Sequence, residues 1–515
     1  MSETVRDTYL RIYSADYLIP VGLSLLRRQL YKELVSTAVR EGFQLTEEAL
    51  QKLESCKNPH QILVQTIERI KRTNPETSFI AAEQIYTDEE TPTPENSVTL
   101  SEEPAAHSPK IETISSVEEE SRVEGELVEF QRLFMSRYHE IRKILAKRRV
   151  EFIPVSELAA VKDGAEASLA VMVLDKQEQK NSLRLEVDDP SGQTVVLASK
   201  KNEQLYTMAL QLPTDVVVGI KVRKMGEINI LTELIYPDVE ETSLIQKPKT
   251  PESYVCLISD IHVGSKHFRR DLFEKFLDWL NRSRDGTVKK ISCIIIAGDL
   301  VEGIGVYPGQ EKDLEIKNVE DQLSMAAQLL AEIPDHIQIV FSPGNHEPVR
   351  KPIPQPPIQH RYRRILNSKR DIIHVSNPAM VLLDGRRFLV YHGQGLDELI
   401  QSLPNVSYST LPENAAEVVA SLLRYRHLAP VYGGNTQLLP MKTDSLVISE
   451  TPHLLQTGHI HVLVNKTYRG VKLVNTGAWQ DQTDYQKALG LEPAVGHFAI
   501  VNLSDMKVEI KNFCT

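Results

Sequence analysis

The spacing of hydrophobic and polar positions divides the chain into four segments. Residues 1–75 carry apolar residues at helical spacing, whereas residues 76–124 carry few apolar residues of any spacing. Residues 125–245 begin with a helical stripe and continue as short β-type runs, and residues 246–515 alternate apolar runs with connections of helical character. The pattern predicts a multidomain protein with a small helical module, a linker, a helix joined to a β-barrel, and an α/β layered domain. A length of 515 residues is too great for one compact core.

Two amphipathic helices are predicted before the β-type runs. The first begins at Asn58-Pro59, because asparagine caps helices and proline suits their first position. Its apolar residues, which share one face, are Leu63, Ile67 and Ile70. The second helix covers about 125–148, and its stripe consists of Leu127, Phe130, Phe134, Tyr138, Ile141 and Leu145.

The segment 76–124 differs from its neighbours in composition and charge. It is rich in Thr, Ser, Pro and Glu, and residues 81–124 hold twelve acidic side chains against two basic ones. Such a segment buries too little apolar surface to offset its ordering entropy, so we predict a disordered acidic tether. This tether accounts for −10 of the net charge of −11. The overall charge is therefore no argument for or against a nucleic-acid partner.

Five short β-type runs lie between about residues 150 and 238. Turn sequences such as Pro-Ser-Gly and Met-Gly-Glu separate them, and five strands in about 90 residues predict a Greek-key barrel of the OB type. OB barrels bind single-stranded nucleic acid or dock other proteins. This one has few aromatic residues interleaved with Lys or Arg, which strand binding prefers, so the sequence favours docking.

Five polar segments stand out in the α/β domain, and the first four directly follow apolar runs. The five are Asp260-Ile261-His262, Gly298-Asp299, Asn345-His346-Glu347, His392 and Gly458-His459-Ile460-His461. Taken singly, each has an ordinary explanation as a turn, a loop cap or a buried histidine. Open α/β sheets, however, place their sites at the carboxyl ends of strands, so these loops are expected to converge.

The five segments together supply two aspartates, one asparagine and four histidines as potential ligands. This set of oxygen and nitrogen atoms suits two divalent cations, with Mn²⁺ expected first and Fe²⁺ or Zn²⁺ as alternatives. Asp299 is the candidate to bridge them, and alternation along the chain sends His459 and His461 toward different cations. No cysteine belongs to the set, which argues against a structural zinc site. The four cysteines lack paired spacing and indicate free thiols.

The series D-x-H, G-D, G-N-H-E, H and G-H-x-H resembles that of the calcineurin-like metallophosphoesterases. The flanking sequences "SDIHVGSKHF", "AGDLVEGIGVYPGQ" and "PGNHEPVRKPIPQPP" resemble the small subunits of archaeal family D replicative DNA polymerases. The resemblance covers residues 125–515 well and the N-terminal part only in arrangement. It implies a calcineurin-like phosphoesterase sandwich preceded by the OB-like barrel and the helical module.

The resemblance also implies roles for individual residues. One cation would be held by Asp260, His262, Asp299 and His461, and the other by Asp299, Asn345, His392 and His459. His346 would protonate the leaving sugar oxygen, and Glu347 would fix its tautomer. The implied reaction is metal-dependent hydrolysis of DNA from the 3′ end, which in a polymerase is proofreading.

The implied partners are a large catalytic subunit, DNA, and a sliding clamp or another replication factor recruited by the N-terminal module. Two alternatives stay open: a scaffold subunit without catalysis, and a phosphoesterase acting on small phosphoesters. The N-terminus lacks the order of a signal peptide, and no apolar run is long enough to span a bilayer. We therefore expect an intracellular, nucleoid-associated protein without a membrane partner.

Overall fold

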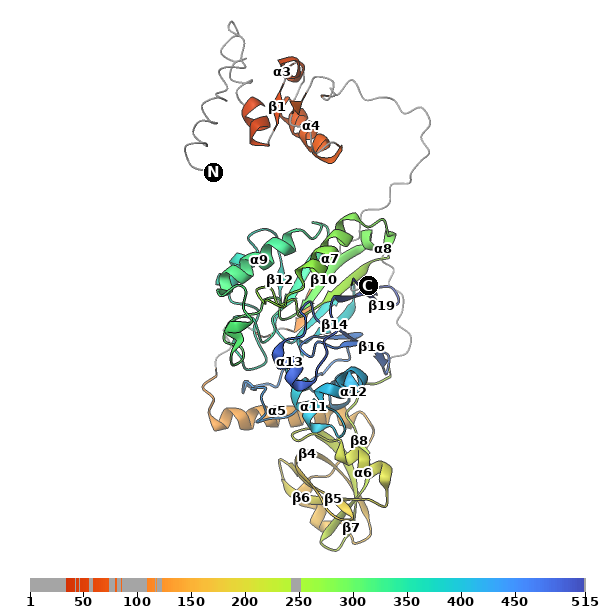
Figure 1. The fold of residues 1–515 in the computed structure, drawn as a ribbon. Coiled ribbons are helices and arrows are strands. Elements are labelled where there is room, and N and C mark those ends of the chain that lie inside the picture. The colour runs from red at the N-terminus through yellow and green to blue at the C-terminus, as the bar shows by residue number, and fades with distance from the viewer. Residues whose placement is uncertain are drawn as a thin grey trace. The chain divides into compact units, whose positions relative to one another are not determined.

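The computed structural model describes residues 34–41, 43–45, 47–54, 59–73, 79–80, 85, 109–115, 117, 123–241 and 252–513. The chain forms two compact units, Met1–Glu103 and Pro104–Thr515, and each is described by itself (Figure 1). Among the described residues, no helix has both the length and the apolar character needed to cross a membrane.

The first unit has its own small core of buried aliphatic side chains. Its described elements are β1 (Gln44–Leu45), α3 (Glu47–Glu54), α4 (Pro59–Thr73) and β2 (Phe79–Ile80), and β1 pairs with β2 in parallel. Helix α4 begins at Pro59 as predicted, and Leu63, Ile67 and Ile70 are buried. The part of the predicted helical module before residue 34 lies outside the described residues.

The second unit contains two six-stranded mixed sheets packed between helices (Figure 1). The first sheet has the order β12 (Ile373–His374), β11 (Gln338–Ser342), β10 (Ile291–Ala297), β9 (Tyr254–Ile258), β18 (His497–Asn502) and β19 (Val508–Asn512). The second has the order β16 (Leu463–Tyr468), β17 (Val471–Thr476), β15 (Leu454–Thr457), β14 (Arg386–Val390), β13 (Ala379–Leu383) and β3 (Ile111–Ser115).

Strand β10 shows how the layers are built, because all seven of its residues are buried. Cys293 and Ile295 face the core between the two sheets, whereas Ile294 and Ile296 face the helices on the other side. Those helices are α7 (Arg270–Arg282), α8 (Gly286–Lys289), α9 (Val319–Ala331) and α10 (His360–Leu366). The outer face of the second sheet is covered by α11 (Leu396–Ser402) and α12 (Leu411–Tyr425). This sandwich of two sheets between helices fits the predicted phosphoesterase fold.

The β-type runs of the sequence form a closed five-stranded barrel. Its strands are β4 (Glu166–Glu178), β5 (Ser182–Asp189), β6 (Gly192–Ser199), β7 (Val217–Met225) and β8 (Ile228–Ile235), in the order β4-β5-β6-β8-β7. Helix α6 (Glu203–Leu210) connects β6 to β7, and α5 (Leu127–Ala146) lies against β4 and β7.

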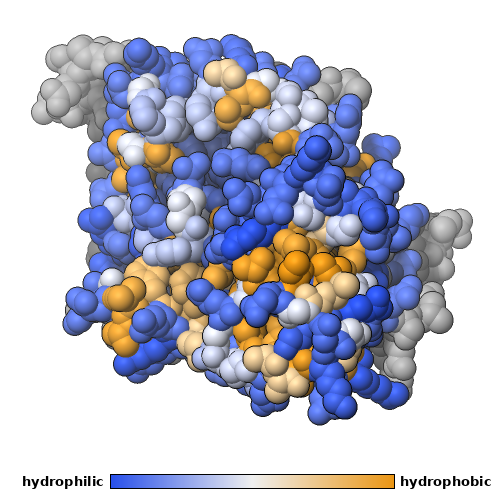
Figure 2. Space-filling model, turned by 90° about the horizontal axis from the view of Figure 1, so that it is seen from below, coloured by the Kyte–Doolittle hydropathy of each residue, from blue (hydrophilic) through white to orange (hydrophobic). Residues whose placement is uncertain are grey.

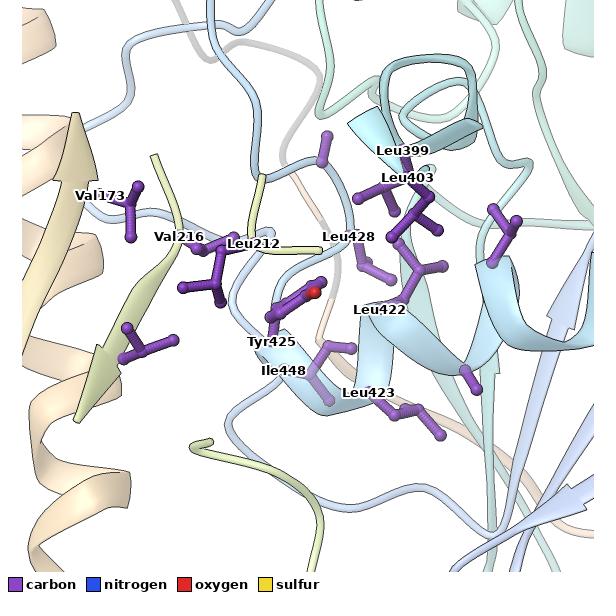
Figure 3. Close-up of a cluster of buried hydrophobic side chains, with 14 of the residues drawn as sticks. Val173, Leu212, Val216, Leu399, Leu403, Leu422, Leu423, Tyr425, Leu428 and Ile448 are labelled. Atoms are coloured by element: carbon purple, nitrogen blue, oxygen red, sulfur yellow. The ribbon is translucent and has the colours of Figure 1, made fainter. Parts of the chain in front are cut away.

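The barrel and the sandwich share one hydrophobic core instead of two separate ones. Figure 3 shows Leu212 and Val216 of the barrel close to Tyr425 and Leu428 of the sandwich. The Tyr425 hydroxyl donates a hydrogen bond to the backbone carbonyl of Gln211 at 3.1 Å. Burying this apolar surface couples the stability of the barrel to that of the sandwich.

The segment predicted as a disordered tether is wrong over at least one stretch. Residues 111–115 form β3, which pairs antiparallel with β13, and the Val117 amide donates to the Ser376 hydroxyl at 3.0 Å. The physical reason is that an edge strand needs only one paired side and few buried side chains. Ile111 is half-buried, whereas Glu112 and Thr113 are exposed.

The predicted stripe of α5 is partly wrong. Tyr138, Ile141 and Leu145 are buried as expected, but Leu127 is 75% exposed at the start of the helix. Arg137, which the stripe leaves out, is fully buried because the sandwich supplies its partners. Tertiary contacts of this kind cannot be read from helical periodicity.

Candidate metal centre

The five polar segments lie at the carboxyl ends of five strands. Strands β9, β10 and β11 run parallel in the first sheet, and β14 and β15 run parallel in the second. The structure brings the seven predicted ligands and His346 together at this edge of the sandwich. The convergence follows from topology, since the carboxyl ends of parallel strands meet at one edge.

Five of the seven predicted ligands have left-handed backbone conformations. These residues and their φ angles are Asp260 (53°), His262 (56°), Asp299 (52°), His459 (68°) and His461 (52°). Side chains other than glycine rarely adopt this region, and each instance costs on the order of 1–3 kcal/mol. Such a cluster indicates that side-chain direction here matters more than backbone comfort.

Two glycines of the motifs are required by close approach. A Cβ atom on Gly344 would lie 2.2 Å from Asp299 Oδ1, and one on Gly458 would lie 2.4 Å from Asp260 Oδ2. Any larger residue would displace these carboxylates. The glycines of G-N-H and G-H-x-H therefore make room for the acidic side chains.

The first ligand group consists of Asp260, His262 and His461. His461 Nε2 lies 3.3 Å from Asp260 Oδ1 and 3.1 Å from His262 Nε2. His262 Nδ1 lies 2.9 Å from a carboxylate oxygen of Glu302 and must donate its proton there. In the neutral ring, the lone pair of Nε2 then faces the group, as metal ligation requires.

The second ligand group consists of Asp299, Asn345, His392 and His459. His392 Nε2 lies 3.1 Å from Asp299 Oδ2 and 3.0 Å from Asn345 Oδ1. His459 Nδ1 lies 2.9 Å from the same Asn345 oxygen. Four potential ligand atoms therefore converge on one point.

The other ring nitrogens fix the tautomers of this second group. His392 Nδ1 donates to the Ala297 carbonyl at 2.8 Å, and His459 Nε2 donates to Asp397 at 3.0 Å. In their neutral forms both rings present lone pairs to the centre. Acceptors consequently face acceptors, an arrangement that a cation stabilises.

Asp299 lies between the two groups. Its Oδ2 atom is 3.1 Å from His392 Nε2 and 3.9 Å from His262 Nε2, while Oδ1 accepts from the His346 amide at 3.0 Å. Burial raises the pKa of Asp299, but His392 and His346 outweigh it and hold that pKa well below its ordinary value. The carboxylate is ionised and is placed as a bridge.

The charge balance of the centre favours cations. Burial lowers the pKa of His262 and of His392, yet the surrounding carboxylates raise the first to about 9 and the second to about 10. The same negative potential that holds these protons would attract divalent ions. The donor set therefore fits two divalent cations of the kind predicted.

Sequence reasoning missed three residues behind the ligands. Glu302 orients His262, Asp397 orients His459, and the Gln486 side-chain amide lies 2.8 Å from His461 Nδ1. Glu302 is 1% exposed, and although burial opposes ionisation, His262 and His346 lower its pKa to about 2. Its position three residues after Asp299 was an available signal, whereas Asp397 and Gln486 lie outside the motifs.

The predicted role of Glu347 is wrong. Its carboxylate accepts from the backbone amides of Asp299 at 2.9 Å, Val301 at 3.2 Å and Gly344 at 2.6 Å, and thereby braces the loops. The His346 tautomer is fixed instead by the Glu302 carbonyl, 2.6 Å from Nδ1. Burial and the Asp299 charge raise the pKa of Glu347 to about 7.

His346 is not aligned with either ligand group. Its Nδ1 is engaged by Glu302, and its Nε2 is 3.9 Å from Asp299 Oδ2, at the wall of a cavity of about 490 Å³. His262, Glu302 and His346 are also mutually close. Their contacts are the Nδ1 hydrogen bonds just described, so this trio is a hydrogen-bonded support.

Comparison with known proteins places this centre in a family. The family model for the B subunits of DNA polymerases alpha and epsilon matches residues 255–461, which include all seven ligands. The DNA polymerase II small subunit of Methanothermobacter thermautotrophicus is 34% identical over 486 residues, covering 92% of this chain and 99% of the relative.

More distant matches agree in part. The DNA polymerase II small subunit of Pyrococcus horikoshii is 37% identical over 410 residues, covering 78% of this chain and 64% of that longer relative. A solved archaeal phosphodiesterase is 12% identical, covers 50% of this chain and 99% of its own, and has a TM-score of 0.24, which is too low to support an argument. From the near-complete match to the Methanothermobacter protein, this chain belongs to the family of DNA polymerase II small subunits.

Proposed function

We propose that this chain is a two-metal 3′→5′ exodeoxyribonuclease that proofreads within a two-subunit replicative DNA polymerase. The observation that carries the proposal is the convergence of seven oxygen and nitrogen ligands in two groups that share Asp299, beside a histidine that belongs to neither. A structural site would require neither the shared carboxylate nor the unaligned His346.

The chain's own residues have distinct roles in this proposal. When bound, two divalent cations supply Lewis acidity and offset the charge of a phosphodiester. Glu302 and Asp397 hold the rings of His262 and His459 so that the lone pairs face inward. His346, oriented by the Glu302 carbonyl, presents Nε2 to the cavity and donates a proton to the leaving sugar oxygen.

The barrel is assigned to the OB type in this proposal. Its strand order β4-β5-β6-β8-β7 and the helix between the third and fourth strands support the assignment. Its shared core with the sandwich supports a docking role over an independent nucleic-acid module.

The name of the relatives, small subunits, supports a large catalytic subunit as partner. Figure 2, which views the molecule from below, shows hydrophobic residues gathered in patches between hydrophilic ones. Large exposed hydrophobic side chains of the barrel and α5 include Leu127, Val128, Met135, Met225 and Ile228. Surfaces of this kind suit a protein partner. The first unit is proposed to recruit a sliding clamp or another replication factor.

Two other functions compete with the nuclease. A scaffold subunit without catalysis would not need a complete ligand set, and every ligand position here is filled. A phosphoesterase acting on small phosphoesters would use the same centre but would need no barrel. The family assignment favours DNA over small substrates.

The test is an exonuclease assay on the purified chain, alone and with its large subunit. Single-stranded DNA labelled at its 5′ end should shorten stepwise from the 3′ end with Mn²⁺, and a chelator should stop the reaction. Bis-p-nitrophenyl phosphate serves as the small-substrate control. Turnover of that control without action on DNA would favour the small-phosphoester alternative, and inactivity on both substrates in the complex would favour the scaffold.

A further inference from the structure

An exposed aromatic side chain lies at the mouth of the cavity. Tyr485 belongs to α13 (Asp484–Leu489), is 61% exposed and lines the cavity that His346 also lines. Its ring lies nearly parallel to that of Tyr307, with the centroids 6.2 Å apart and an interplanar angle of 24°. The fold gains little from leaving so large an apolar surface in water.

Tyr307 is held firmly beneath it. Its hydroxyl lies 3.2 Å from Glu302 Oε1 and 3.1 Å from Asp313 Oδ2, and its ring centroid lies 6.3 Å from that of His346. His346, Tyr307 and Tyr485 therefore form a row of rings that leads outward from the centre.

The helix that carries Tyr485 is tied to the centre as well. Thr483 caps α13 by accepting from the Gln486 amide, and the Gln486 side chain contacts His461. One turn of helix therefore fixes both a ligand histidine and the exposed ring. The position of Tyr485 relative to the centre is set by the fold.

We propose that Tyr485, backed by Tyr307, is a stacking subsite for the nucleobase of the terminal nucleotide of single-stranded DNA. The inference deepens the proposed nuclease function and rests on it. The ligand side of the cavity is polar and suits a phosphodiester. The side next to Tyr485 includes Pro308, Leu489 and Leu491 and suits a flat apolar ring. Stacking accepts every base, as an exonuclease requires.

The kinetic test compares Tyr485→Ala with the unaltered full chain on two oligonucleotides. One ends in an ordinary 3′ nucleotide, and the other ends in an abasic 3′ nucleotide. With the ordinary end, we expect KM to rise about 5- to 50-fold with little change in kcat, the fold-change that loss of one base–aromatic contact gives. With the abasic end, the two proteins should have equal KM. Equal KM values on the ordinary end would overturn the proposal.

Two variants serve as matched controls. Tyr485→Phe keeps the ring and should keep the KM of the unaltered chain. Tyr432→Ala removes another tyrosine, 45% exposed, whose ring contacts Phe130 and Phe134 of α5, and should leave KM unchanged. A KM rise in Tyr485→Phe equal to that in Tyr485→Ala would contradict stacking.

A binding measurement separates this subsite from the proposed catalysis. An oligonucleotide carrying 2-aminopurine at its 3′ end is titrated in chelator, and stacking on Tyr485 should quench the fluorescence. The quench should be lost in Tyr485→Ala and kept in Tyr485→Phe. A quench without any nuclease activity would support the subsite and reject the proposed reaction. The same signal in all three proteins, or in none, would overturn the subsite.

Discussion

Two clusters of buried charge in the second unit are built on opposite principles. In the interface cluster of Arg137, His427 and Asp444, donors face acceptors. Arg137 Nε donates to Asp444 Oδ2 at 2.9 Å, and His427 Nε2 lies 2.9 Å from the same oxygen. In the candidate metal centre, lone pairs face lone pairs around Asn345 and Asp299.

The two clusters also differ in backbone conformation. None of the three residues of the interface cluster has a positive φ angle, whereas five ligands of the metal centre do. The interface cluster is nearly complete within the protein, with Arg137 Nη2 as its one nitrogen without a partner in the described residues. The first cluster is arranged to join α5 to the sandwich, and the second is arranged to hold something that the protein does not supply.

The largest expected effect is on turnover at the metal centre. His346→Ala should lower the exonuclease rate by about 10²- to 10⁴-fold, the contribution of a positioned general acid. Its metal content, measured by mass spectrometry, should equal that of the unaltered protein because His346 aligns with neither ligand group. His360→Ala, which alters an exposed histidine at the start of α10, is the control and should leave the rate unchanged. Metal loss in His346→Ala would make it a ligand.

At the interface cluster, the large effect should be on stability. Asp444→Ala leaves the buried Arg137 guanidinium without its carboxylate and should lower the free energy of unfolding by about 3–5 kcal/mol. Metal content should not change. Glu274→Ala removes an exposed pair with Arg270 on α7 and should cost less than about 1 kcal/mol. Similar losses in the two variants would remove the contrast.

The sequence predicted the metal centre better than the interface cluster for a physical reason. Ligands such as Asp260 and His392 follow strands directly, so strand order alone brings them together. The partners of Arg137 come from a loop about 300 residues away, and no local pattern links them. The same limit applies to Glu347, whose residue type was known but whose direction depends on the fold.

The position of β3 predicts an effect of truncation. A fragment of residues 104–515 keeps this edge strand, whereas a fragment of residues 124–515 loses its pairing with β13 and the buried Val117. The shorter fragment should be less stable by about 2–4 kcal/mol and should still bind metal, since no ligand lies before residue 124. Denaturant unfolding of both fragments measures this difference. Equal stability would show that β3 contributes nothing to the sheet.

The smallest effect concerns pH on the barrel side. Burial, with Asp189 and Asp215 nearby, raises the pKa of Asp188 to about 6. A raised folded pKa contributes stability that is fully present below the ordinary value near 4 and is lost as pH rises through 6. Because Asp188 is half-exposed, Asp188→Asn should stabilise the protein by only about 1 kcal/mol at pH 7.5, with no gain near pH 4. Asp175→Asn, at an exposed position of β4, is the control. A gain independent of pH would contradict this account.

The most direct test of the metal centre is its stoichiometry. The chelated protein is dialysed to equilibrium against Mn²⁺, and bound metal is counted per chain. We predict two ions in the unaltered protein and a loss of both in Asp299→Ala, because Asp299 lies between the ligand groups. Asp444→Ala, folded at low temperature, should still bind two. Fewer than two ions in the unaltered protein, or two in Asp299→Ala, would contradict a shared two-metal centre.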